Sequence, residues 1–288
     1  MTYLKHVTYA LVIPLLYLAT YWEVRKRVFT NVFLTMSRLR YEVHLENIKS
    51  IVMANVSRII ADRLCFLSLL LPFWLFRRLI MRLVPPVGIE KLDATLAHGK
   101  GAILFSCHIG PYYLTPAVLA LLGYKVVAVE RLGFLEAPIV NYHVGRINGL
   151  KGETVLMTTT IYDDLLLRKL RGHLRKGRIV FIMGDYRGAF NCRGKYAKFL
   201  GYDIVPGRGI AWLHSRTGAP IVPIVIRYCN GRRPQLEVRD ELAVDKDQGM
   251  GYITQEVYHT LEELILQNPE RWALWMDYHL MLAPEVRE

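Results

Sequence analysis

His108 is the residue of this sequence best placed to do acid–base chemistry. It ends the stretch 101–108, in which the apolar residues 102–105 have the length and composition of a buried strand. Gly110 and Pro111 follow, and apolar residues then recur at helical spacing over 113–122, so the histidine is predicted to lie in a strand-to-helix turn. Catalytic groups of open α/β sheets lie in such turns, beyond the carboxyl ends of the strands. A hydrogen-bonded structural role is the alternative, and it is the commoner role of an isolated histidine.

A second group of polar residues follows another apolar run in the same way. The sequence GDYRG, residues 184–188, comes directly after the predicted strand 178–183, so it should share a sheet edge with His108. Asp185 could hold the imidazole or pair with Arg187, and Arg187 could bind a phosphate or carboxylate as a planar fork. The alternative is a turn that needs Asp and Gly only for its backbone conformation.

The cysteines suggest no chemistry of their own. They lie far apart and show no CxxC or Cys/His metal spacing, which predicts neither a metal site nor a disulfide framework; they are Cys65, Cys107, Cys192 and Cys229. Cys107 directly precedes His108, but neighbouring residues of a strand point to opposite faces, which argues against a Cys–His nucleophile pair.

A sheet must position these residues, and the chain from residue 89 onward has the pattern of one. The expected helices are 113–122, 162–176, 209–217 and 252–267, with helix and loop over 135–149, and the expected strands are 102–105, 125–129, 178–183, 219–227 and 235–239. This alternation predicts an α/β domain over 89–288, with a mostly parallel central sheet flanked by helices. Neither GxGxxG nor GxxxxGK[ST] occurs, which argues against nucleotide-driven chemistry.

Residues 1–88 are predicted to form a helical, apolar N-terminal region that contacts a membrane. The uncharged stretch 7–22 is shorter than the roughly 20 residues that span a bilayer, and Pro14 interrupts it. The stretch 64–84 combines aromatic residues with arginines, as interfacial amphipathic helices do. The alternative is that both stretches are ordinary core helices, and exposed aromatic residues would distinguish the two interpretations.

The net charge of +12, from 37 Lys and Arg against 25 Asp and Glu, predicts an anionic partner. Nucleic acid, an anionic membrane leaflet and an acidic carrier protein all fit that charge. Basic and aromatic residues alternate over 193–209, a composition that also suits single-stranded nucleic acid. However, the chain has no helix-turn-helix, RNP or zinc-finger pattern, and apolar N-terminal segments suit a nucleic-acid-binding protein poorly. We therefore expect no nucleic-acid partner.

Four blocks of the sequence, taken together, resemble the glycerolipid and lysophospholipid acyltransferase superfamily, and most closely its late acyltransferases of lipid A biosynthesis. The first is GAILFSCHIGPYY with His108, and the second is VERLGFLEAPIV, in which Arg131 is the counterpart of a family arginine. The third is MGDYRG, followed by KFLG and GIAWLHSRTGAPIVPIVIR, and the fourth is NPERWALW. Each block alone is a weak signal, whereas four in the family's order, from about residue 92 to 275, are a specific one.

The resemblance implies transfer of an acyl chain from a carrier thioester to a hydroxyl or amine acceptor. The donor would be acyl carrier protein or coenzyme A, His108 would be the general base, and no cofactor or metal is expected beyond the thioester co-substrate. A membrane-associated protein on the cytoplasmic face of the inner membrane is also implied. The residues expected to contact the anionic donor or the membrane are Arg131, Arg187, Lys195, Lys198 and Arg208.

The sequence departs from the family at one position beside the histidine. The family has an acidic residue five positions after the histidine, and this chain has Tyr113 there. We expect Glu130 or Asp185 to replace that carboxylate, because a triad depends on geometry and not on sequence position. The alternatives are an already nucleophilic acceptor such as an amine, a non-catalytic protein that binds acyl chains or carriers, and a thioester hydrolase. Tyr113 would also line a narrower, aromatic acceptor pocket.

Overall fold

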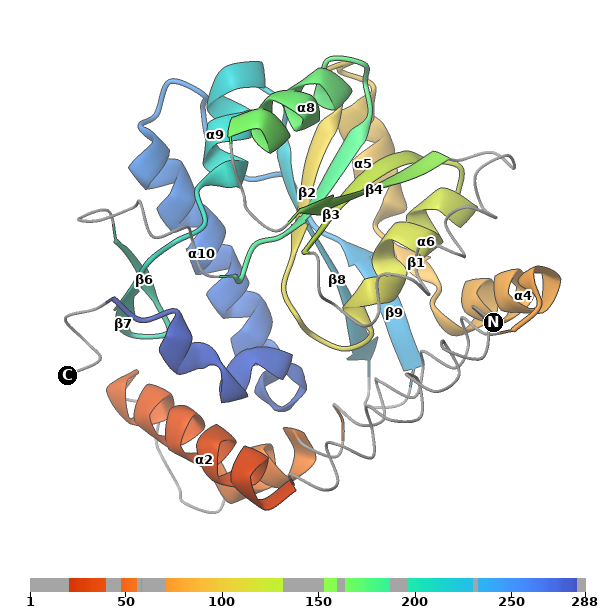
Figure 1. Ribbon diagram of the computed structural model, residues 1–288. Coiled ribbons are helices and arrows are strands. Elements are labelled where there is room, and N and C mark those ends of the chain that lie inside the picture. Colours follow the sequence, from red (N-terminus) through yellow and green to blue (C-terminus); the bar gives the residue numbers. More distant parts are fainter. Residues whose placement is uncertain are drawn as a thin grey trace.

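A seven-stranded sheet in the order β1-β9-β8-β2-β5-β3-β4 forms the centre of the molecule (Figure 1). The structure is a computed structural model that describes residues 21–39, 48–55, 58, 71–131, 153–159, 164–186, 196–229 and 233–283. The strands of this sheet are β1 (Pro86–Val87), β2 (Ala102–Ser106), β3 (Lys125–Arg131), β4 (Glu153–Thr159), β5 (Ile179–Met183), β8 (Ile221–Cys229) and β9 (Arg233–Val238).

The predicted α/β fold with a mostly parallel sheet is confirmed. Strand β2 pairs in parallel with β5 and β8, and β3 pairs in parallel with β4 and β5. The exceptions are β9, which runs antiparallel to β8 because only a short connection separates the two strands, as in a hairpin, and β1, which pairs in parallel with β9. Strand β4 is not among the predicted strands, since the apolar run of its sequence ETVLMTT is limited to residues 155–157.

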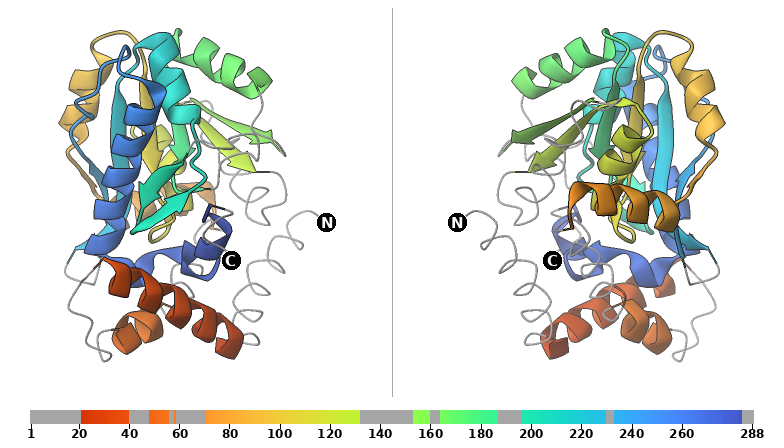
Figure 2. Two further views of the ribbon diagram at one scale, coloured as in Figure 1. Left: turned by 90° about the vertical axis from the view of Figure 1, so that its left-hand side faces the viewer. Right: turned by 90° about the vertical axis from the view of Figure 1, so that its right-hand side faces the viewer.

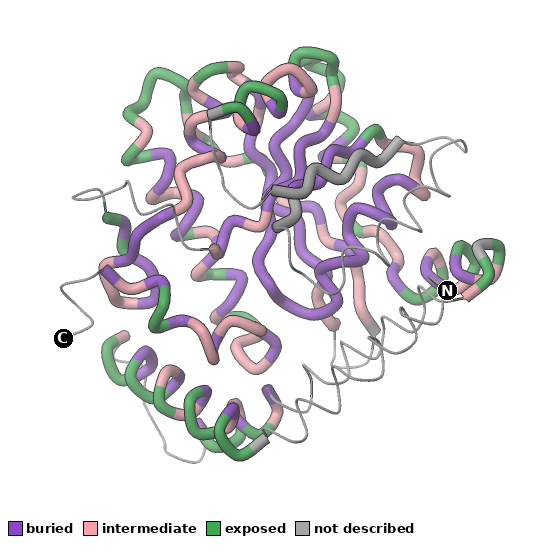
Figure 3. Tube along the Cα trace, viewed as in Figure 1, coloured by how far each residue is buried: buried purple, intermediate pink, exposed green. Residues whose placement is uncertain are grey.

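Helices cover both faces of the sheet, and strand β2 shows how the faces are assigned. Ile103 and Phe105 belong to one core, which α8 (Asp164–Leu174), α9 (Gly209–Thr217) and α10 (Met250–Gln267) complete. Ala102 and Leu104 belong to the opposite core, with α4 (Phe73–Leu83), α5 (Ile89–Leu96) and α6 (Thr115–Leu121). Side chains of a strand alternate between faces, so β2, which is buried along its whole length (Figure 3), is apolar in all but its last residue, Ser106.

The described helices of the N-terminal region pack against the rest of the chain. Helix α2 (Tyr21–Arg38) lies at the bottom of the molecule in Figures 1 and 2 and buries Val24, Val28, Val32 and Met36, which are spaced by one helical turn. These side chains share a core with Trp272 and Trp275 of the C-terminal segment. The predicted division of the chain at residue 88 stays a prediction. Most of the apolar stretch 7–22, and residues 64–70 of the second one, lie outside the described residues.

Two smaller elements complete the fold beside the main sheet. Strands β6 (Ala197–Phe199) and β7 (Tyr202–Ile204) form an antiparallel pair next to α10. After α10 the chain continues through three short 3₁₀ helices, η3 (Pro269–Arg271), η4 (Ala273–Met276) and η5 (Tyr278–Leu280). The segment containing η3 and η4 passes beneath the carboxyl end of β2, where the candidate site lies.

Candidate active site

The register of two neighbouring strands brings His108 and Asp185 together. Ser106, the last residue of β2, pairs with Met183, the last residue of β5, and the N–H of Gly184 donates a hydrogen bond to the Ser106 carbonyl at 2.8 Å. Two residues beyond these ends stand His108 and Asp185, side by side although they are 77 positions apart in the sequence. The structure therefore confirms the prediction that the two motifs meet at one edge of the sheet.

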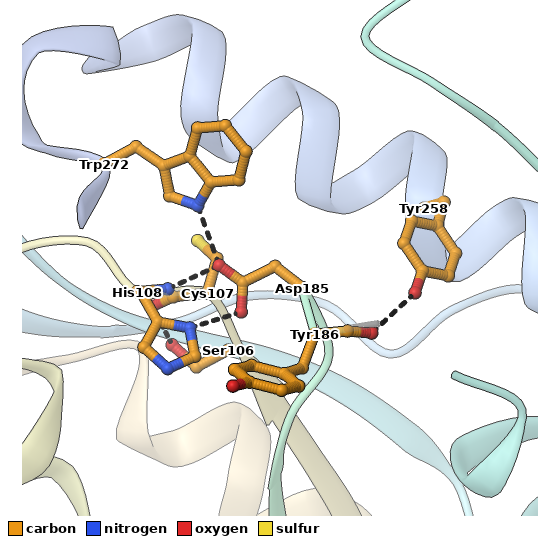
Figure 4. A network of polar contacts seen from close by, with 7 residues as sticks. All are labelled: Ser106, Cys107, His108, Asp185, Tyr186, Tyr258 and Trp272. Carbon is orange, nitrogen blue, oxygen red and sulfur yellow. Dashed lines mark hydrogen bonds and ion pairs between the residues drawn. The ribbon is translucent and has the colours of Figure 1, made fainter. Parts of the chain in front are cut away.

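Asp185 is the acceptor of three hydrogen bonds (Figure 4). The Nδ1 atom of His108 lies 2.7 Å from Oδ1, and the His108 main-chain N–H donates to Oδ2, also at 2.7 Å. The indole N–H of Trp272 donates to Oδ2 at 2.7 Å. Asp185 is fully buried and His108 is 5% exposed. A buried carboxylate needs such donors, because an unpaired buried charge is strongly unfavourable.

This network fixes the form of the neutral imidazole. The ionised carboxylate is acceptor-only, so the ring proton belongs on Nδ1. Nε2 then carries the lone pair, and it points away from Asp185 (Figure 4). A histidine held in this tautomer can accept a proton at Nε2, and the carboxylate behind it stabilises the imidazolium that forms.

Aromatic rings pack around the imidazole, while the predicted acceptor pocket lined by Tyr113 stays a prediction. The ring centroid of Tyr112 lies 4.6 Å from that of His108 in an edge-on arrangement, and the ring of Tyr186 lies 6.1 Å away. Tyr113 is buried one layer further out, with its ring 5.7 Å from that of Tyr112. Tyr112 therefore packs directly on the His108 ring, and Tyr113 packs on Tyr112.

The turn that presents His108 requires a glycine at position 110. Gly110 has φ +59°, and a Cβ atom there would lie 2.8 Å from the main-chain oxygen of Ile226. Both the left-handed backbone and the close approach to β8 exclude a side chain. The tight turn holds the loop after the histidine against the sheet.

Cys107 is not positioned as a nucleophile. Its side chain is fully buried in the core that faces α10, while His108 lies outside that core, as the alternation of strand residues predicts. Burial, together with the negative charge of Asp185, raises the pKa of the Cys107 thiol well above its ordinary value of 9.0. The thiol is therefore protonated and poorly nucleophilic at neutral pH.

The other predicted site residues are not brought to the dyad by any described contact. Lys198 is an exposed residue of β6 whose ammonium group pairs with Asp203 at 2.8 Å, and Arg208 directly precedes α9. Glu130 and Arg131 end strand β3, and the structure describes only their backbone. Arg187 and Lys195 lie outside the described residues.

Trp272 belongs to this hydrogen-bond network, although no sequence pattern predicts it there. Its block, NPERWALW, carries a resemblance to the family but is equally typical of a packed C-terminal cap. Nothing in its spacing links it to Asp185, which is 87 residues away. The one sequence signal for this role is that Trp272, an aromatic residue with an N–H donor, lies within a block that resembles the family.

A buried His–Asp pair at the carboxyl edge of a mostly parallel sheet is an arrangement that α/β enzymes use for general-base chemistry. The family of bacterial lipid A biosynthesis acyltransferases matches residues 47–279 of this chain, and the chain belongs to that family. The match confirms the resemblance stated from the sequence and extends it toward the N-terminus. Membership indicates acyltransferase activity in lipid biosynthesis. A search of curated proteins finds no match.

Proposed function

We propose that this protein transfers an acyl chain from a carrier thioester to a hydroxyl or amine acceptor, with His108 as general base and Asp185 as the carboxylate that orients it. The observation that carries the proposal is the 2.7 Å contact between His108 Nδ1 and Asp185 Oδ1, with both side chains buried. In this site Asp185 takes the place of the acid that the family has five positions after the histidine. Tyr113 then needs no part in proton transfer.

The proposed reaction balances with these two residues. Nε2 of His108 removes the proton of the acceptor O–H or N–H as that atom forms a bond to the thioester carbonyl carbon. The tetrahedral intermediate collapses with cleavage of the C–S bond, and the leaving thiolate takes the proton from Nε2. Asp185 remains ionised throughout and stabilises the transient imidazolium.

The donor in this proposal is acyl carrier protein or coenzyme A, and the basic surface of the chain supports it. A net charge of +12 attracts both the acidic carrier and the phosphates of the coenzyme. Lys198 and Arg208 are partly or fully exposed and remain proposed contacts, as do Arg131, Arg187 and Lys195.

We further propose that α4 binds the anionic surface of the cytoplasmic face of the inner membrane. Its outer face presents Trp74, 68% exposed, with Arg77, Arg78 and Arg82 at helical spacing, and α4 contains no acidic residue. Its inner face buries Phe76 and Ile80 in the core. Exposed tryptophan beside arginines suits the headgroup region, and cytoplasmic thioester donors would reach the site from that side.

Helix α2 shows a similar exposed aromatic. Trp22 is 70% exposed, and the guanidinium of Arg25 lies 5.6 Å from its ring. Within the described part of the chain, no helix has the length and apolar character needed to cross a bilayer.

The test is acyl transfer by the purified protein and its His108→Ala variant. Lauroyl-coenzyme A or lauroyl–acyl carrier protein serves as donor, and a lipid A precursor or a long-chain amine serves as acceptor. Mass spectrometry detects the acylated product. We expect the variant to lose about 10³-fold or more in rate, since the residual rate would come from binding alone.

A matched control is His214→Ala. His214 is equally buried, but its Nδ1 contacts the Ala219 carbonyl at the opposite, amino-terminal edge of the sheet. It should keep transfer activity while losing comparable thermal stability. Full transfer by His108→Ala would overturn the proposal. So would free fatty acid as the main product with acceptor present, which indicates a hydrolase, or a bound acyl chain without turnover, which indicates a binding protein.

A further inference from the structure

The C-terminal segment holds both members of the His108–Asp185 pair. The indole N–H of Trp272 donates to Asp185 Oδ2, and the next main-chain N–H, of Ala273, donates to the His108 carbonyl at 2.8 Å. Ile109 and Trp272 also form an isolated antiparallel β-bridge. The same two residues of the C-terminal segment therefore fix the aspartate through a side chain and the histidine through the backbone.

The two oxygens of Asp185 have different partners, and this matters for orientation. Oδ1 faces the His108 ring, while Oδ2 accepts the Trp272 indole N–H and the His108 main-chain N–H. Rotation of the carboxylate would break bonds at both oxygens in a fully buried site. The donors on Oδ2 thus hold Oδ1 in line with Nδ1 (Figure 4).

The Trp272 ring is itself immobilised by neighbouring aromatic rings. Its centroid lies 4.7 Å from Trp275, 5.6 Å from Tyr278 and 5.9 Å from Phe199, all in edge-on or near edge-on arrangements. The side chain is fully buried. Because the ring is already immobilised, its hydrogen bond to Asp185 forms with little further loss of side-chain entropy.

The N-terminal region fixes the backbone of this segment. Asn55, fully buried, donates from Nδ2 to the main-chain oxygens of Trp272 and Glu270, each at 3.0 Å. Arg58 pairs with the Glu270 carboxylate. The contacts run from the residues around 55 through Trp272 to Asp185 and His108.

We propose that Trp272 is a positioning residue for the acyl transfer proposed above, acting on His108 through Asp185. The proposal rests on the proposed function for its kinetic test, and it has a second test that does not. Trp272 touches no reacting atom in this assignment. It fixes the orientation of the carboxylate and stabilises its negative charge through the indole N–H hydrogen bond.

The kinetic test is Trp272→Phe, which removes the indole N–H and keeps an aromatic ring in the cluster. We expect kcat to fall roughly 10- to 100-fold, because small misplacements of catalytic groups have effects of that size, while KM for lauroyl-coenzyme A changes less than about threefold. The acidic limb of the pH dependence of kcat/KM should also be displaced, since the aspartate loses a donor to its charged form.

The matched control is Trp275→Phe in the same aromatic cluster. The Trp275 indole N–H donates to the Pro269 carbonyl, at 2.6 Å, and has no bond to Asp185. This variant should lose similar thermal stability but keep kcat within about threefold and keep the pH profile of the parent. Equal losses of kcat in the two variants, in proportion to their stability, would show that Trp272 is merely structural.

The second test uses the indole N–H resonance of Trp272 in a ¹H–¹⁵N spectrum, assigned from Trp272→Phe. Asp185→Ala removes the acceptor of this N–H, so it should shift this resonance strongly and leave that of Trp275 in place. No shift overturns the proposal whether or not acyl transfer is observed. If Trp272→Phe does not fold, replacement of Trp272 by benzothienylalanine keeps the ring shape without the N–H. If the His108→Ala variant is inactive while the separate Trp272 variant is fully active, only the positioning role of Trp272 is rejected. If the His108→Ala variant is active, the proposed function is rejected.

Discussion

At the scale of single residues, the proposed chemistry depends on which nitrogen of His108 carries the proton. Two N–H donors converge on Oδ2 of Asp185, one from the His108 backbone and one from Trp272. In an Asp185→Asn variant these donors would hold the amide oxygen at that position, so the amide NH₂ would face Nδ1. The ring proton would then move to Nε2, which could no longer accept one.

We therefore predict that Asp185→Asn lowers kcat about 10⁴-fold, the loss caused by the corresponding change in a serine protease triad. The measurement is single-turnover acyl transfer, with circular dichroism to confirm that the variant is folded. A loss smaller than tenfold in a folded variant would mean that the aspartate does not orient the base.

Tyr113→Glu tests whether the family position of the acid is still needed. Tyr113 is buried and packs on Tyr112, whose ring in turn packs on His108, while Asp185 already occupies Nδ1. We predict no gain in activity and a lower thermal midpoint, because the substitution removes a buried aromatic ring and transfers a carboxylate out of water. Tyr113→Phe keeps the ring and should keep activity close to the parent. A rise in kcat for the glutamate variant would show that the site works below its potential without that acid.

At the scale of elements, the sequence predicted the strands correctly where an apolar run ends in polar residues. β2 and β5 are continuous apolar stretches bounded by glycine, and their parallel pairing placed His108 beside Asp185 as expected. Strand β4 was not predicted because its apolar run, residues 155–157, is too short to stand out from a loop. The direction of β9 does have a local signal, since Asn230 and Gly231 lie between the two strands and this dipeptide is typical of a hairpin. Trp272 could not be placed because its partner is set by tertiary packing alone.

Helix α4 carries a prediction about membrane binding. Replacing Arg77, Arg78 and Arg82 by glutamate reverses the charge of its exposed face while Phe76 and Ile80 keep it packed in the core. We expect the variant to bind vesicles containing phosphatidylglycerol at least about tenfold more weakly, since each basic residue near an anionic surface contributes about 1 kcal/mol. Vesicle co-sedimentation measures this.

The control for α4 is the same change of charge on α8 and the turn after it, with Arg168, Arg175 and Lys176 replaced by glutamate. These residues are exposed, and α8 lies at the top of the molecule in Figure 1, whereas α4 lies lower, at the right. This variant should keep most of its vesicle binding. Equal loss in both variants would point to a general charge effect and against a surface formed by α4.

At the scale of the whole molecule, buried acids link stability to alkaline pH. Burial raises the pKa of the Tyr278 hydroxyl above its usual range, as it does for the Cys107 thiol. The unfolded chain releases these protons first as the pH rises, so the free energy of unfolding falls above pH about 9 to 10, by about 1.4 kcal/mol per pH unit for each group. Below that range both groups are protonated in both states and contribute no pH dependence.

Tyr278→Phe isolates this effect. The Tyr278 hydroxyl donates to the Phe199 carbonyl at 2.6 Å, so at pH 7 its removal should lower the free energy of unfolding by about 1–2 kcal/mol. At pH 11 the difference between parent and variant should narrow, because only the parent loses the contribution of the buried hydroxyl. Urea unfolding at both pH values measures it, and a constant difference would contradict the expectation.

The origin of the His–Asp pair on two separate strands has a consequence for how this site can diversify. Where base and acid share one short loop, every change in that loop endangers proton transfer. Here the carboxylate comes from the end of β5, so the residues from Ile109 to Tyr113 do not have to supply it, although the turn at Gly110 and the bridge from Ile109 to Trp272 still constrain their backbone. That loop can accumulate substitutions that select a new acceptor while the proton-transfer pair is inherited intact.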